Sequence, residues 1–221
     1  YCDDKNAPAQ KFADDFILGD YNDEHKILEF VNKVNVVTYE FENIPFNTLE
    51  FINKHKQVLP KPNINQVIQN RFSEKNFINN LGIKTTDYVI IKNLKDLNNN
   101  LNLLPGILKT TTLGYDGKGQ FRLNNKNEVD QYKINFNNEY ILEKIINLKK
   151  EISVIITRFK NKNYEIYEPI ENIHKDQILK FSEIPAKISS NILNLSTDWA
   201  KKISEELDYV GTLCVEYFID E

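Results

Sequence analysis

Lys109-Thr-Thr-Thr-Leu-Gly-Tyr-Asp-Gly-Lys-Gly-Gln-Phe121 is the stretch that decides the fold, and it holds three of the chain's seven glycines within six positions. Glycine adopts positive φ and brings bare backbone amides close to an anion, and Lys109 and Lys118 can supply positive charge. We therefore expect a loop that wraps around phosphate. Nucleotide binding is the first functional hypothesis.

The segments on either side of this loop, 106–111 and 120–123, have the composition of short strands. The loop is therefore predicted to be a hairpin that covers phosphates from above. A Walker A loop instead leads directly into a helix, whose N-terminus binds the phosphate. Spacing alone leaves a second interpretation open, a surface hairpin with flexible glycines.

Composition indicates a soluble globular protein. The 221 residues carry a net charge of −4 with mixed signs, which does not favour nucleic acid as a partner. No apolar run approaches the length of about 20 residues that a membrane span needs, and no signal-like segment opens the chain, so we expect the cytoplasm. Cys2 and Cys214 have neither disulfide nor zinc-site spacing.

Hydrophobic periodicity predicts an α/β region followed by α+β regions. Strand, helix and strand patterns alternate up to Leu59, and Pro60-Lys61-Pro62 stiffens a linker. Because the chain lacks an initial Met and stops directly after an apolar strand, we expect truncation at both ends. The predicted domains are an N-terminal α/β domain (1–62), a linking helix (63–82), a small lid domain (83–146) and an antiparallel sheet with a covering helix (147–221).

Several carboxylates occupy positions where ligands are bound. Glu40 and Glu42 follow a strand, where open α/β sheets bind substrates, although two solvated carboxylates are an equally good interpretation. Glu151 begins a strand and is placed to accept ribose hydroxyls, or is merely exposed. Glu216 is predicted to be buried among apolar neighbours, so it requires a metal such as Mg²⁺ or, alternatively, a structural salt bridge.

The segment Glu143-Lys144-Ile145-Ile146 follows a strand and precedes the last domain, so it is predicted to connect two domains. Adenine is commonly bound in such connections by backbone groups between apolar side chains. We therefore expect this segment to bind adenine.

These motifs together resemble the 5-(carboxyamino)imidazole ribonucleotide synthases, ATP-grasp ligases of purine biosynthesis. The flap sequence and the Thr38-Tyr39-Glu40-Phe41-Glu42-Asn43 element are the most specific matches. The other matching segments, in the same order along nearly the whole chain, are 69–75, 151–154, 167–174 and 210–218. The resemblance implies an ATP-grasp fold preceded by a truncated Rossmann-like (pre-ATP-grasp) domain, and a homodimer.

The resemblance also implies the reaction and the role of each matching residue. ATP phosphorylates bicarbonate to carboxyphosphate, and the exocyclic amine of 5-aminoimidazole ribonucleotide then takes up the carboxyl. Lys109 and His174 are implied as catalytic, and Glu40, Glu42, Tyr115 and Asp116 as binding the aminoimidazole nucleotide. Glu216 is implied as a Mg²⁺ ligand. The implied ATP-binding residues are Arg71, Lys109, Gly114, Tyr115, Asp116, Gly117, Lys118, Gly119, Gln120, Glu143, Lys144, Ile145, Ile146, Glu151 and His174.

Two kinds of alternative stay open. Another ATP-grasp ligase, such as a formate-dependent glycinamide ribonucleotide transformylase or a biotin carboxylase, would share the lid and the carboxylates. A non-catalytic nucleotide-binding remnant would keep the flap without the chemistry. The family also has a Gly-rich turn before Tyr1 and an Asn-Glu-Ile-Ala-Pro-Arg segment after Glu221, so we expect the 221 residues alone to be catalytically incompetent.

Overall fold

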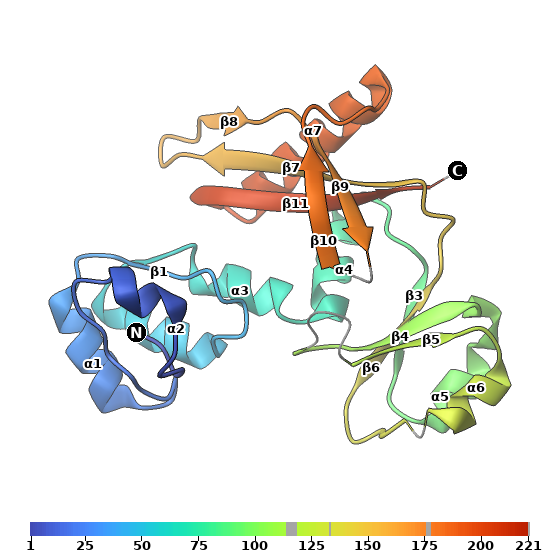
Figure 1. The fold of residues 1–221 in the computed structure, drawn as a ribbon, viewed down its shortest axis with the longest axis horizontal. Helices are drawn as coiled ribbons and strands as arrows, with labels where there is room; N and C mark the ends of the chain where they lie inside the picture. The colour runs from blue at the N-terminus through green and yellow to red at the C-terminus, as the bar shows by residue number, and fades with distance from the viewer. Residues whose placement is uncertain (114–118, 133, 176–177, 221) are drawn as a thin grey trace. The chain divides into compact units, whose positions relative to one another are not determined.

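The computed structural model describes residues 1–113, 119–132, 134–175 and 178–220. They form two compact units, Tyr1–Ile68 and Gln69–Glu221 (Figure 1). The predicted linking helix over 63–82 is divided between them, since it is two helices, α3 (Pro62–Ile68) and α4 (Arg71–Asn80).

The cause of this interruption is Asn70, whose side chain accepts hydrogen bonds from the backbone N–H groups of Phe72 and Ser73. An asparagine in this position satisfies N–H groups that have no partner within the helix, so it starts a new helix.

The first unit is a small α/β arrangement around β1 and β2. These two strands pair in parallel, Val37 with Val58 and Thr38 with Leu59, and α2 connects them, which confirms the predicted strand–helix–strand order. Ile27, Val31 and Leu49 are buried between the helices and the strands. The elements that precede α3 are η1 (Pro8–Phe12), α1 (Glu24–Lys33), β1 (Val37–Thr38), α2 (Phe46–His55) and β2 (Val58–Leu59).

The second unit begins with α4 and then forms a four-stranded antiparallel sheet in the order β3-β6-β4-β5. Leu108, Leu123 and Leu142 are fully buried in a core that also includes Leu97 from α5 and Val129 from α6. The elements of this part are β3 (Tyr88–Ile91), α5 (Leu94–Asn99), η2 (Leu101–Leu103), β4 (Gly106–Thr110), β5 (Gln120–Leu123), α6 (Lys126–Gln131) and β6 (Tyr140–Lys144).

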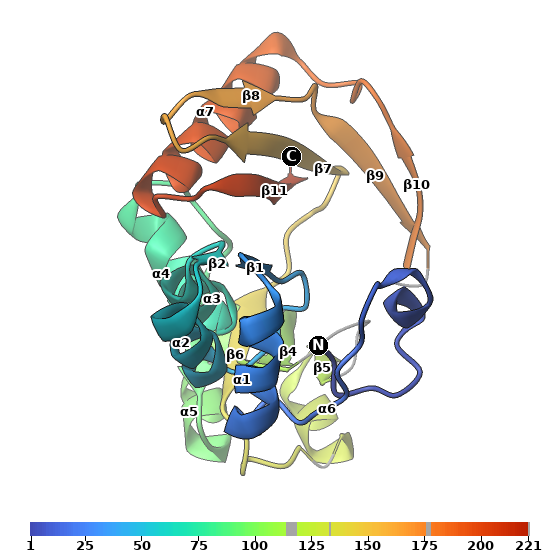
Figure 2. The same ribbon diagram turned by 90° about the vertical axis from the view of Figure 1, so that its left-hand side faces the viewer.

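A second antiparallel sheet, in the order β10-β9-β7-β11 with β8 paired to β7, completes this unit. Helix α7 covers one face of it, where Val154, Ile156 and Ala200 are buried (Figure 2). The elements are β7 (Lys150–Arg158), β8 (Tyr164–Ile166), β9 (Ile170–Lys175), β10 (Ile178–Glu183), α7 (Ser190–Glu206) and β11 (Gly211–Ile219). The predicted sheet with a covering helix is therefore confirmed.

Strand alternation gives the four-stranded sheet two different faces. On β6, Tyr140 and Leu142 belong to the apolar core, whereas Ile141 and Glu143 point to the opposite face. Lys109 of β4 pairs with Ile141 in the ladder, so it shares that second face. The sheet thereby brings Lys109 and Glu143 together.

Candidate functional site

The two strands on either side of the glycine-rich stretch pair antiparallel, as predicted. Strands β4 and β5 are antiparallel, with Lys109 opposite Gln120, and the Thr110 N–H donates to the Gly119 carbonyl at 3.1 Å. Gly119 adopts a φ of 72°, which is a glycine conformation. Gly114, Tyr115, Asp116, Gly117 and Lys118 lie outside the described residues.

Arg71 ties the start of α4 to the end of β4, directly before the hairpin loop. Its backbone N–H donates to the Thr111 carbonyl at 2.9 Å, and its guanidinium Nη1 donates to the Thr110 carbonyl at 2.8 Å. The Thr111 N–H in turn donates to the Glu139 carbonyl at 3.0 Å. The base of the hairpin is therefore fixed from both sides.

On β6, the neighbour of strand β4, Glu143 lies between two lysines. Its Oε2 is 2.8 Å from the Lys109 Nζ, and its Oε1 is 3.3 Å from the Nζ of Lys75 on α4. All three side chains are largely shielded from water, with 9% of Glu143, 19% of Lys109 and 18% of Lys75 exposed. We call these three residues the Lys-Glu-Lys cluster.

The electrostatics of this cluster favour an ionised carboxylate. Burial raises the pKa of Glu143, but the ammonium groups of Lys109 and Lys75 offset it, so the pKa lies below its ordinary value. Two ammonium groups and one carboxylate leave the cluster with one net positive charge. That charge suits an anion such as phosphate.

The connection after β6 is held by backbone hydrogen bonds. The Lys144 N–H donates to the Asp87 carbonyl at 2.9 Å, and the Ile145 N–H donates to the Pro105 carbonyl at 3.0 Å. The Thr86 hydroxyl donates to the Lys144 carbonyl at 2.6 Å. Glu143 and Lys144, which were predicted to follow the strand, are instead its last two residues, and the Glu143 side chain belongs to the Lys-Glu-Lys cluster.

On the second sheet, Glu151 and His174 lie side by side. The Glu151 Oε2 is 3.3 Å from the His174 Nδ1, and the two side chains are 17% and 31% exposed. Burial raises the pKa of Glu151, the neighbouring His174 lowers it, and the Glu216 carboxylate raises it again, so the pKa is above its ordinary value. Two predicted site residues from distant segments are thus brought together, and a third is close enough to influence them.

The predicted burial of Glu216 is wrong. Alternation along β11 does place it on the same face as Cys214 and Phe218, but that face is exposed, and the other face packs against α7. No group of three or more metal-binding side chains is found among the described residues. Glu216 and Glu151 offer two carboxylates of the hard-oxygen type that Mg²⁺ prefers.

A polar chain on β7, β9 and β10, in which Ser153 and Asn172 are buried and Ser182 is exposed, was not predicted. The Asn172 side-chain amide donates to the Ser153 hydroxyl at 2.9 Å, and the Ser182 hydroxyl donates to the Asn172 carbonyl oxygen at 2.9 Å. Asn172 pairs with Glu151 in the ladder, so this chain lies beside the Glu151–His174 pair. The Asn172-Ile173-His174 sequence within a strand is the signal that could have indicated it.

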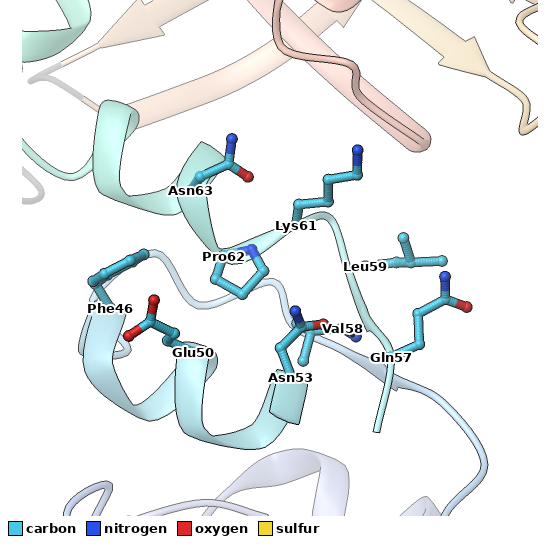
Figure 3. Close-up of a pocket in the computed structure, with 9 residues that line it drawn as sticks. All are labelled: Phe46, Glu50, Asn53, Gln57, Val58, Leu59, Lys61, Pro62 and Asn63. Atoms are coloured by element: carbon cyan, nitrogen blue, oxygen red, sulfur yellow. Dashed lines mark hydrogen bonds between the residues drawn. The ribbon is translucent and has the colours of Figure 1, made fainter. Parts of the chain in front are cut away.

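In the first unit, Glu40 and Glu42 follow β1 and are exposed. A pocket of about 390 Å³ lies between α2 and residues 57–63 (Figure 3). Phe46, Glu50 and Lys61 are among the side chains that line it, and none of the predicted site residues does. The pocket therefore adds nothing to the assignment of Glu40 and Glu42.

The family follows from a comparison of the sequence with models of protein families. The model described as the ATP-grasp domain matches residues 76–221, more than half of the chain. The chain belongs to the ATP-grasp family. A second model, described as the ribonucleotide synthetase preATP-grasp domain, matches residues 1–69. The predicted ATP-grasp fold class is thereby confirmed.

Two curated relatives of this ATP-grasp chain carry the same name. The N5-carboxyaminoimidazole ribonucleotide synthase of Brucella melitensis is 36% identical over 218 residues, which are 96% of this chain and 60% of the relative. That of Bacillus subtilis is 34% identical over 220 residues, 98% of this chain and 58% of the relative. The resemblance inferred from the motifs is confirmed, and the chain spans about 60% of the length of these relatives.

Two solved structures of similar name also resemble this ATP-grasp chain. The ADP complex of an N5-carboxyaminoimidazole ribonucleotide synthetase is 37% identical, with a TM-score of 0.93 over 99% of this chain and 59% of that one. The Staphylococcus aureus N5-carboxyaminoimidazole synthetase complexed with ADP is 31% identical, with a TM-score of 0.91 over the same shares. Within the described part of this chain, no helix has the length and apolar character of a membrane span.

Proposed function

We propose that the protein is an ATP-dependent ligase that carboxylates 5-aminoimidazole ribonucleotide with bicarbonate to N5-carboxyaminoimidazole ribonucleotide, ADP and phosphate. The observation that carries the proposal is the extent of the match, 36% identity over 96% of the chain to a relative of that name. The ADP complexes of two related structures support the nucleotide.

Lys109 and Arg71 are assigned to the ATP phosphates. Lys109 lies at the base of the hairpin in a cluster with one net positive charge, and Arg71 holds the strand end from which the hairpin loop starts. Gly114 to Gln120 are assigned to closure over the phosphates. Such a closed lid excludes water, which would otherwise hydrolyse an activated carboxyl group before the amine reacts.

The remaining ATP contacts are assigned to the connection and to the second sheet. Residues Glu143 to Ile146 take the adenine through their backbone, and Glu151 takes the ribose hydroxyls. His174, 3.3 Å from Glu151, is assigned to the phosphate and bicarbonate region. A raised pKa at Glu151 suits a carboxyl group that sits in a partly desolvated site.

Mg²⁺ is part of the proposal, with Glu216 as a ligand. The divalent cation supplies charge stabilisation for phosphoryl transfer when it is bound. The exposed carboxylate of Glu216, close enough to raise the pKa of Glu151, fits an oxygen ligand. Glu40, Glu42, Tyr115 and Asp116 are assigned to the aminoimidazole nucleotide, and the homodimer to the assembly of the full-length protein.

The test measures ADP formation by the full-length gene product. We expect bicarbonate together with 5-aminoimidazole ribonucleotide to stimulate it, and formate together with glycinamide ribonucleotide to leave it unchanged. Stimulation by the second pair would identify a different ATP-grasp ligase, and ATP binding without turnover would identify a non-catalytic remnant.

Two variants sharpen this test. Lys109→Met should lower turnover at least tenfold, roughly the value of one charge-assisted contact in the transition state. Lys92→Met is the matched control, because Lys92 is 67% exposed and its 3.5 Å pair with Glu139 is a surface contact. Equal activity of the two variants would contradict the role of Lys109.

A further inference from the structure

Lys75 is the second cation of the Lys-Glu-Lys cluster, and the assigned reaction gives it no role. It lies on α4, in the turn that follows Arg71, and its Nζ approaches the Glu143 Oε1 at 3.3 Å. Lys109 approaches the other oxygen, Oε2, at 2.8 Å. Each ammonium group therefore has a carboxylate oxygen of its own.

We propose that Lys75 is a positioning residue for nucleotide binding, which neutralises Glu143 and so leaves the charge of Lys109 available to the phosphates of ATP. This inference rests on the proposed function. Without Lys75, one carboxylate would face one ammonium group, and phosphate would meet a neutral pair. With Lys75, the cluster keeps one positive charge.

Burial makes this count of charges matter. The three side chains are between 9% and 19% exposed, so water and salt screen them less than they screen surface charges. In such surroundings an uncompensated Glu143 would repel a phosphate and so offset its attraction to Lys109. The compensating charge must therefore be close by and fixed in place.

The structure fixes Lys75 through Tyr88 of β3. The Lys75 Nζ lies 5.7 Å from the centre of the Tyr88 ring, which favours a cation over its face. The Tyr88 hydroxyl donates to the Asn76 side chain at 2.9 Å and accepts from the Asn79 side chain at 2.9 Å. Tyr88 is also the ladder partner of Glu143. Helix α4 and strand β6 are thus joined at the point where Lys75 is needed.

The test is calorimetric titration of the full-length gene product with ATP and, separately, with adenosine, both in magnesium chloride. We expect Lys75→Met to weaken ATP binding roughly tenfold and to leave adenosine binding within about twofold, since only phosphate senses the lost charge. Lys75→Arg should bind ATP like the wild type, because arginine keeps the positive charge.

The decisive variant is Lys75→Met combined with Glu143→Gln. This pair removes one positive and one negative charge, so the net charge of the cluster returns to one, carried by Lys109 alone. ATP affinity should recover to within about threefold of the wild type, although two contacts are lost, because the two changes are coupled through charge. If Lys75 had a purely structural role, the double variant would bind ATP at least as weakly as Lys75→Met does.

The outcomes separate this inference from the proposed function. Lys92→Met, which removes an exposed lysine of the same sheet region, should bind both ligands like the wild type. Wild-type protein that binds neither ATP nor adenosine would overturn the proposed function and this inference with it. Wild-type binding with Lys75→Met unaffected, or with ATP and adenosine equally weakened, would overturn this inference alone.

Discussion

When Glu143 is replaced by glutamine, the four-stranded sheet should open far more easily than in the wild type. The substitution keeps the shape of the side chain but leaves Lys109 and Lys75 facing each other, both more than four-fifths buried. At 2.8 and 3.3 Å, and with an effective dielectric constant of about 20, each ion pair is attractive by about 5 to 6 kcal/mol before desolvation is subtracted. The net cost of breaking a buried pair is about 3–5 kcal/mol.

Hydrogen exchange of peptides that cover β4 and β6 measures this cost directly, because it reports the opening of these strands and not of the first unit. A loss of about 3–5 kcal/mol accelerates exchange roughly 100- to 5,000-fold. Glu139→Gln is the control, since it removes the partner of the exposed Lys92 and should cost at most about 1 kcal/mol. If the two variants exchange equally fast, the Lys-Glu-Lys cluster does not stabilise the sheet and our reasoning about it is wrong.

Three further predictions concern pH, backbone and buried polar groups. Because the folded-state pKa of Glu143 is lowered, its stabilisation should be complete above its ordinary pKa of 4.5 and should disappear as the pH falls further, so that wild-type protein and the glutamine variant exchange alike in acid. Gly119→Ala should lower the thermal stability more than Gly82→Ala in calorimetry: both glycines have positive φ, which costs alanine about 1–2 kcal/mol, but only at Gly119 would the new Cβ meet a side chain, at 3.1 Å. Asn172→Leu should cost about 1–3 kcal/mol in urea denaturation, because the buried Ser153 hydroxyl loses its partner, and a midpoint equal to that of the wild type would contradict this.

The hairpin was predictable from the sequence because its signals are local. Glycines between two strand-like segments specify a hairpin whatever the rest of the chain does, and Lys109 lies opposite Gln120 as that pattern requires. The strand–helix–strand order of β1, α2 and β2 was predictable for the same reason, since each of these patterns is a short-range feature. The fold class then followed from the order of such segments.

Contacts between segments that are distant in the sequence were harder to predict. Glu143 was expected in the connection after β6, because its sequence neighbours alone do not reveal that Lys75 lies 68 positions earlier on a helix that reaches the same face of the sheet. The Glu216 error has a related cause. Both faces of β11 contain apolar residues, and only the position of α7 decides which one is buried.

Helix starts depended on caps that the periodicity did not reveal. The apolar pattern continues through Asn70, so one helix was expected where there are two. The Asn70 side chain caps the second helix and so separates it from the first. In the same way α7 begins at Ser190, because the Ser189 side chain accepts a hydrogen bond from the Ile192 N–H.

The two faces of β6 also constrain how the chain can misfold. A slip of one residue would move Glu143 into the apolar core and place Leu142 between two lysines. The slipped pairing would therefore bury the carboxylate of Glu143 and leave both ammonium groups without their partner. The correct pairing is therefore favoured over its nearest competitor by two buried ion pairs at once. Glu143, which is assigned to the nucleotide site, therefore also fixes the register of β6. Substitutions at this position are limited by folding even in a protein that has lost its activity.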